Sequence, residues 1–106
     1  MWVSGTGPVW PDGSCPDDAR VQTQRCFEII MTALAEAGAT LEDVVRTRMY
    51  LTSADDAEVV SAVHGELFAR ILPAATMVVV AALLDPRWRI EIEVDALIRR
   101  EQRPSR

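Results

Sequence analysis

Hydrophobic and acidic residues alternate along the segment IEIEVDALI, residues 90–98. Ile90, Ile92 and Val94 fall on one side of an extended chain, and three carboxylates fall on the other side. A period of two predicts a β-strand with one buried face and one polar face. The acidic residues are Glu91, Glu93 and Asp95, and they face either solvent or a polar cleft.

Residues 44–52 alternate in the same way and predict a second half-polar strand. If this strand lies beside the acidic one, its two arginines can pair with two of the three carboxylates. Glu91 is then the carboxylate that remains available for function. The predicted pairs join Arg46 and Arg48 to Glu93 and Asp95, and the predicted apolar side consists of Val45, Thr47, Met49 and Leu51.

Apolar residues recur every three or four positions in two other segments, which predicts two amphipathic helices. The first helix spans residues 16–37, with acidic residues in its first turn, and Gly38 ends it. The second opens at Ser53 and stops before Pro73. The buried stripes are Thr23, Phe27, Ile30, Leu34 and Ala37 in the first helix, and Val60, Val63, His64, Leu67 and Phe68 in the second.

The segment ATMVVVAAL, residues 75–83, is apolar on both sides, which is typical of a strand buried on both faces. Two helices cover only one face of a sheet. We therefore expect another copy of the chain to cover the second face, in a symmetric homo-oligomer. The alternative is that residues preceding Met1 fold over this face. The predicted contact residues are Met77, Val79, Ala81 and Leu83.

With a short strand at residues 1–6, the order of elements is strand, helix, strand, helix, strand, strand. This order predicts an α+β fold, a single mixed sheet with two helices packed on one face. The chain opens inside a strand with no lead-in, which suggests that a preceding strand is missing. We assign residues 1–98 to one domain and expect residues 99–106 to form a disordered C-terminal tail.

Composition narrows the function classes. The 106 residues carry a net charge of −5 and no Lys/Arg-rich run ahead of the C-terminus, which argues against nucleic-acid binding. No apolar run is long enough for a bilayer and the start lacks signal-peptide features, so we expect a cytoplasmic protein that binds no membrane. Cys15 and Cys26 lie outside any metal-binding spacing and are interpreted as reduced, structural thiols.

Five segments occur in an order typical of one protein family: VSGTGP at 3–8, AGATLEDVVRTRMYLT at 37–52, HGELF at 64–68, LPAAT at 72–76 and IEIEVDALI at 90–98. With them the chain resembles the Rid family (reactive intermediate deaminases, also called YjgF or L-PSP endoribonuclease family). The resemblance implies a chorismate-mutase-like fold and a homotrimer with a ligand cleft between subunits. It also implies hydrolysis of 2-imino or 2-enamino acids to 2-keto acids and ammonia, with no metal or organic cofactor.

The resemblance also implies site residues. In the best-known branch, a PARS segment supplies an arginine that holds the substrate carboxylate, and Ala75 stands at that position here. Alanine offers neither charge nor donor, so we expect no efficient turnover of simple 2-imino acids. Ser61 stands where that branch often has asparagine. The implied ligand-binding residues are Gly5, Ser61, Ala75, Thr76 and Met77, of which Thr76 and Met77 contribute their backbone, and the implied catalytic acid is Glu91.

Other reactive side chains are assigned structural roles. His64, the only histidine of the chain, lies on an apolar helix stripe, which favours a packed histidine with one bonded nitrogen over a catalytic one. Ser61 and Thr76 have no nearby histidine in the sequence to activate a hydroxyl. The tryptophans are assigned to the core or the subunit seam, although one could line the mouth of a cleft. They are Trp2, Trp10 and Trp88, and Trp88 is the one that could line the cleft.

Three functions remain. The first is an imine- or enamine-hydrolysing enzyme with a substrate other than simple 2-imino acids. The second is a non-catalytic trimer that binds a metabolite. The third is RNA cleavage, suggested by the older family name and opposed by the acidic charge and by the lack of a His or Lys pair for phosphodiester chemistry.

Overall fold

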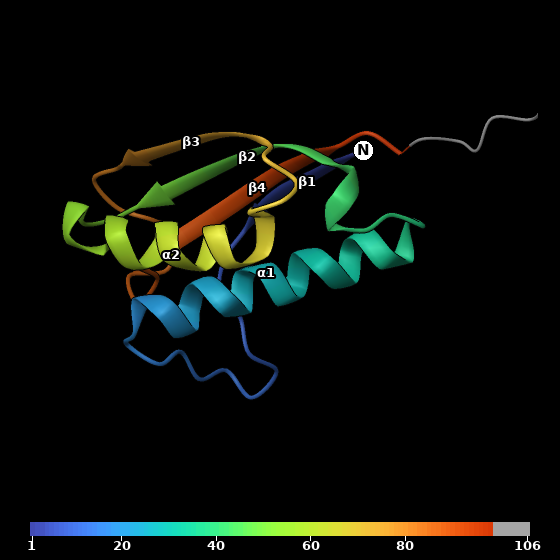
Figure 1. The fold of residues 1–106 in the computed structure, drawn as a ribbon. Helices are drawn as coiled ribbons and strands as arrows, with labels where there is room; N and C mark the ends of the chain where they lie inside the picture. The colour runs from blue at the N-terminus through green and yellow to red at the C-terminus, as the bar shows by residue number, and fades with distance from the viewer. Residues whose placement is uncertain (99–106) are drawn as a thin grey trace, which may run out of the picture.

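One four-stranded sheet and two α-helices account for most of residues 1–98, the part of the chain that this computed structural model describes (Figure 1). The predicted tail at residues 99–106 lies outside the described part. The elements are β1 (Trp2–Thr6), α1 (Ala19–Glu36), η1 (Leu41–Asp43), β2 (Val44–Leu51), η2 (Ala54–Asp56), α2 (Ala57–Phe68), β3 (Ala74–Val79) and β4 (Ile90–Ala96).

The sheet has the strand order β1-β4-β2-β3. Strand β4 is antiparallel to both β1 and β2, and β2 is parallel to β3, so the acidic strand is central. Both helices lie on the same side of this sheet, and its other face is open in Figure 1. The predicted α+β architecture is therefore confirmed.

The core forms between the helices and one face of the sheet. Ile90, Ile92 and Val94 on β4 are completely buried, as are Phe27 and three other large residues of the helices and β2. Each such side chain contributes about 1.5–3 kcal/mol through loss of contact with water. The three others are Ile30, Leu34 and Leu51.

The predicted apolar side of β2 is wrong at Val45, which is 49% exposed. The register between β2 and β4 shifts between Val44 and Arg46, so the pairing skips Val45. A bulge of this kind interrupts the alternation of the two faces. Beyond the bulge, Thr47, Met49 and Leu51 are buried as predicted.

The strand predicted for residues 75–83 is shorter than expected. Strand β3 ends at Val79, and although the Val80 N–H still donates to the Leu51 carbonyl, residues 81–83 lie outside the strand. Ala81 and Leu83 therefore share no strand face with Met77. Met77 pairs with the buried Met49 and packs against the core of its own chain, so it does not lie on the open face.

Helix α1 begins three residues later than predicted. Asp18 is its N-cap, and the Asp18 carboxylate accepts a hydrogen bond of 3.0 Å from the Val21 N–H. Gly38 follows the helix with φ +81°, a conformation that glycine adopts without strain. Ala37 lies at the helix end and is exposed, which corrects its placement on the buried stripe.

None of the three tryptophans belongs to the buried core. Trp2 is 82% exposed on the open side of β1. Trp10 is half-buried, with the Arg25 guanidinium 5.9 Å from the centre of its ring. Trp88 is half-buried against Gly7, where a Cβ atom would overlap the indole.

A completely buried side chain on α1, Gln22, ties two loops to the helix. Its Nε2 donates to the Pro16 carbonyl at 2.8 Å and to the Arg87 carbonyl at 3.0 Å. Its Oε1 accepts from the Arg89 N–H at 2.7 Å. One amide thus joins three backbone groups from two loops to the helix through part-buried hydrogen bonds.

We expect Gln22→Leu to lower the free energy of unfolding by about 2–4 kcal/mol, because leucine fills the space but removes three part-buried hydrogen bonds to the two loops. Gln24→Leu, an exposed position on the same helix, serves as the control and should change stability by about 0.5 kcal/mol or less. Urea denaturation followed by circular dichroism measures both. Equal stability of the two variants would contradict the role assigned to Gln22.

Candidate functional site

Glu91 and Gly5 come together where β1 pairs with β4. Between Val3 and Thr6 the register shifts, so that β1 contains a bulge. A Cβ atom at Gly5 would overlap the Glu91 carboxylate, so only glycine lets that carboxylate lie against the β1 backbone. The structure therefore brings together two of the predicted site residues.

A hollow of about 570 Å³ lies beside this contact, between β1, the loop that follows it and α1. Trp88 lines this hollow. The sequence leaves two places open for Trp88, either the core or subunit seam, or the mouth of a cleft. Arg25 also lines the hollow, with its Nε donating to the Val9 carbonyl at 2.7 Å.

The other two carboxylates of β4 are paired. Arg48 donates from Nε to Glu93 at 2.6 Å and from its terminal nitrogens to Asp95 at 3.2–3.3 Å. The Tyr50 hydroxyl donates to Glu93 at 2.7 Å. The hydrogen bond from Tyr50 and then that from Arg48 lower the pKa of Glu93 below its ordinary value of 4.5.

The predicted pairing needs one correction, because a single arginine holds both carboxylates. Arg46 lies directly opposite Asp95 but is exposed, and it makes no salt bridge within residues 1–98. Arg48 reaches Asp95 diagonally across the strands, which a long side chain can do. Glu91 has no hydrogen-bond or salt-bridge partner in the described part of the chain, as the prediction required.

A second group of predicted residues lines a pocket of about 290 Å³ between α2 and β3. Ser61 comes from α2, and Ala75 and Met77 come from β3. Since alternate residues of a strand face the same side, Ala75 and Met77 both face α2. The complete lining is Met49, Ser61, His64, Gly65, Ala75 and Met77.

His64 is packed, as predicted, and it also lines this pocket, which sequence reasoning missed. Its Nε2 lies 2.9 Å from the Thr47 hydroxyl, and Phe68 lies against the ring with centroids 4.6 Å apart. Burial lowers the pKa of His64 below 6.5. The spacing of Ser61 and His64, three residues apart on one helix, was the available signal that both could line one cavity, and it corrects the expectation that Ser61 has no nearby histidine.

Thr76 does not contribute its side chain to the lining of the pocket. It pairs with Arg48, whose side chain lies on the open face, and it is exposed there. The implied contact of Thr76 is through its backbone, which the direction of the side chain does not change.

The Glu91 group and the Ala75 group do not form one site within a single chain. Strand β2 lies between β4 and β3, so these two strands are about 10 Å apart, and Glu91 is three residues along β4 from Val94, which is in line with Ala75. The two groups also lie on opposite faces of the sheet. Glu91 alternates with the buried Ile90 and Ile92 and so points to the open face, whereas Ala75 faces α2. A site that contains both groups requires two chains.

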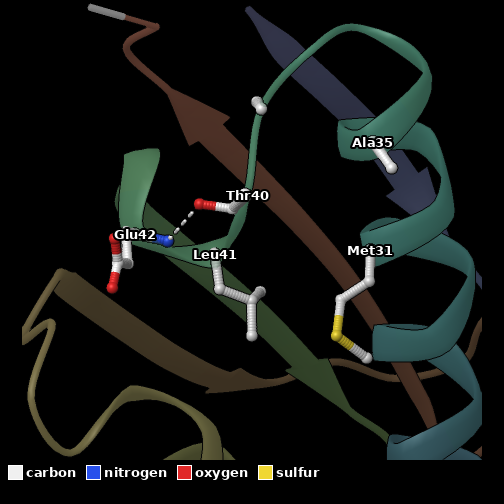
Figure 2. Close-up of a pocket in the computed structure, with 6 residues that line it drawn as sticks. Met31, Ala35, Thr40, Leu41 and Glu42 are labelled. Carbon is white, nitrogen blue, oxygen red and sulfur yellow. Dashed lines mark hydrogen bonds between the residues drawn. The ribbon is translucent and has the colours of Figure 1, made fainter.

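A further hollow, of about 520 Å³, lies between the C-terminal part of α1 and η1 (Figure 2). Met31 and Leu41 face each other across it, and Thr40 accepts a hydrogen bond of 3.3 Å from the Glu42 N–H. It contains none of the predicted site residues and has only Glu42 as a charged lining residue. Its mostly apolar lining offers no converging polar groups for catalysis.

Residues 1–98 contain no group of three or more His, Cys, Asp or Glu side chains placed to hold a metal ion. Within the same residues, neither helix combines the length and hydrophobicity needed to cross a bilayer.

Comparison with known proteins decides the family. The family described as Endoribonuclease L-PSP matches residues 1–98, which is the whole of the described fold. The chain belongs to this family. An uncharacterized protein of Streptomyces coelicolor is 37% identical over 79 residues, which are 74% of this chain and 59% of that protein. A RutC family protein of Pyrococcus abyssi is 34% identical over 103 residues, 95% of this chain and 79% of that protein.

Solved structures agree with this assignment. A member of the YjgF/YER057c/UK114 family from Mycobacterium tuberculosis is 41% identical with a TM-score of 0.83, over 92% of this chain and 77% of that one. A Rid family protein from Yersinia pestis is 31% identical with a TM-score of 0.86, over 92% and 79%. Escherichia coli TdcF, solved with bound serine, is 25% identical with a TM-score of 0.85, over 92% and 80%.

We expect Arg48→Met to lower the urea midpoint near neutral pH, because two carboxylates on adjacent pleats of β4 lose their cation. Arg46→Met is the matched control and should leave the midpoint unchanged, since Arg46 makes no salt bridge in the described residues. Because the pKa of Glu93 is lowered in the folded protein, its stabilisation is present above about 4.5 and is lost as the pH falls below that value. The difference between wild type and Arg48→Met should therefore shrink in acid, and a constant difference down to pH 3 would contradict the assignment.

Proposed function

We propose that this protein binds a small metabolite between neighbouring chains and hydrolyses an imine or enamine other than a simple 2-imino acid. The observation that carries the proposal is Ala75 in the α2–β3 pocket, where the family's best-known branch has a carboxylate-binding arginine. The pocket lining holds no cation apart from a protonated form of His64, and burial disfavours that form.

Glu91 is the proposed acid and base. Water adds to the carbon of the C=N bond while the carboxylate takes one proton from the water and passes it to the nitrogen, which gives a neutral carbinolamine. The carboxylate then takes the hydroxyl proton of the carbinolamine and passes it to the nitrogen as the C–N bond breaks. Ammonia and a carbonyl compound leave, and the carboxylate is regenerated. Support comes from the position of Glu91, which is half-buried, unpaired within residues 1–98 and held against the Gly5 backbone.

A neutral or amine-bearing ligand suits this arrangement. An anion in a cleft formed by the Ala75 pocket of one chain and Glu91 of another would meet a carboxylate without a compensating cation. The family resemblance supports a cleft of this kind, since it implies a ligand site between subunits. The separation of the two groups within one chain also supports it. The open sheet face, with the exposed Trp2 and Val78, provides apolar surface for contact between copies.

A second candidate is a binding protein without catalysis. The bound serine of TdcF favours it, since a family member of similar fold holds an amino acid. Ribonuclease activity has less support, because the net charge of −5 repels a phosphate backbone.

The proposed assembly is a cyclic trimer. Multi-angle light scattering on the purified chain should give three times the 11.7 kDa of one chain, with no monomer at micromolar concentration. A folded monomer would remove the shared cleft and, with it, the proposed site.

We expect Ala75→Arg to gain binding of pyruvate or 2-ketobutyrate and some hydrolysis of 2-iminobutanoate, because arginine restores a two-point contact for a carboxylate. Ala75→Met is the control for size without charge and should gain neither. Calorimetric titration and a coupled deaminase assay are run on wild type, both variants and Ala75→Arg/Glu91→Gln.

Two results would correct the proposal. Tight binding of 2-keto acids by the wild type would mean that another residue holds the carboxylate. If Ala75→Arg binds keto acids and remains inactive, position 75 is the carboxylate-binding position, and the role proposed for Glu91 is wrong.

A further inference from the structure

We infer that His64 donates a hydrogen bond from Nδ1 to an uncharged acceptor in the α2–β3 pocket, so that the pocket selects neutral carbonyl compounds over 2-keto acids and over protonated amines. This inference rests on the proposed function, because it concerns the ligand of the same site. It narrows the ligand to one chemical class and names the residue that recognises it.

The Thr47 hydroxyl determines which nitrogen of His64 carries the proton. Thr47 is completely buried, and in the described part of the chain the hydroxyl has one partner, His64 Nε2 at 2.9 Å. A buried hydroxyl that donates to no acceptor costs about 1–3 kcal/mol. The hydroxyl therefore donates to Nε2, and a neutral ring that accepts at Nε2 carries its hydrogen on Nδ1.

The rest of the ring surface is largely occupied. Phe68 lies against it at a centroid distance of 4.6 Å and an angle of 33°, and Phe27 approaches at 6.2 Å in an edge arrangement. No hydrogen bond to Nδ1 is present among residues 1–98. Since Thr47 occupies Nε2, Nδ1 is the ring nitrogen that has no partner among residues 1–98, and it belongs to a side chain that lines the pocket.

The neighbours of His64 favour a ligand of modest size and no charge. Ala75 faces Thr47 across the β2–β3 pairing, and its short side chain leaves the space in front of the ring open. Met49 and Met77 supply apolar walls, and Ser61, one helical turn before His64, supplies a hydroxyl. Since burial lowers the pKa of His64, the ring is neutral at physiological pH and gives an anion no ionic partner.

The single histidine of this chain allows a direct first test. Nitrogen-15 NMR of the imidazole in the wild type should show the proton on Nδ1, and Thr47→Val should convert the ring to a mixture of tautomers because the donor to Nε2 is gone. A proton on Nε2 in the wild type would overturn the inference before any ligand is added.

The second test compares pyruvamide with pyruvate, which have almost the same shape and differ in charge. We expect pyruvamide to bind the wild type and to shift the Nδ1 resonance. Pyruvate should bind at least about tenfold more weakly than pyruvamide. His64→Phe keeps the aromatic packing and loses the donor, so it should weaken pyruvamide binding about five- to tenfold, the effect of one net hydrogen bond. His64→Gln, which keeps an N–H donor, should recover part of that loss.

Equal affinity of pyruvamide for wild type and His64→Phe would overturn the inference, as would the absence of pyruvamide binding or a preference for pyruvate. The proposed function is judged separately by imine hydrolysis in the wild type. If imines are hydrolysed and Nδ1 does not respond to pyruvamide, the inference is wrong and the proposed function stands. If Nδ1 responds and no imine is hydrolysed, the ligand class is right and the proposed catalysis is wrong.

Discussion

Burial of the hydrophobic side of β4 is the constraint on which the rest of the structure depends. Ile90, Ile92 and Val94 have no contact with water, and a shift of one residue would exchange them for three carboxylates. The register of β4 against β1 and β2 is therefore strongly specified. Because β4 is central, the same register also determines which residues of β1 and β2 stand beside each carboxylate.

The three carboxylates of β4 have different surroundings because their neighbours on the adjacent strands differ. Two of them lie within reach of Arg48 and become part of the scaffold, together with the Tyr50 hydroxyl. Glu91 stands next to a bulge in β1, where glycine leaves room for its carboxylate. One strand thus supplies both a structural ion-pair network and a carboxylate that remains available for chemistry.

The pocket at the other edge depends on the parallel pairing of β2 and β3. That pairing places Ala75 opposite Thr47, and Thr47 in turn orients His64 of α2. His64 therefore serves both the packing and the proposed ligand binding. The contacts that bury its imidazole also determine which ring nitrogen can bind a ligand. The same geometry explains why the helix pattern assigned His64 only a packing role: the proposed role in binding depends on a contact 17 residues away in sequence.

The sequence by itself determined the α+β fold and the inward faces of the helices and of β4, because these follow from local periodicity. The expectation that position 75 lacks a carboxylate-binding arginine came from the resemblance to the family. Only the tertiary structure decided that Arg48 holds both acids and that Arg46 holds neither, since this depends on a register with a bulge at Val45. It also decided that His64 lines the pocket that contains Ser61 and Ala75. Such relations join segments far apart in the chain, and their geometry is set by the packing of helices on a sheet, which no local pattern encodes.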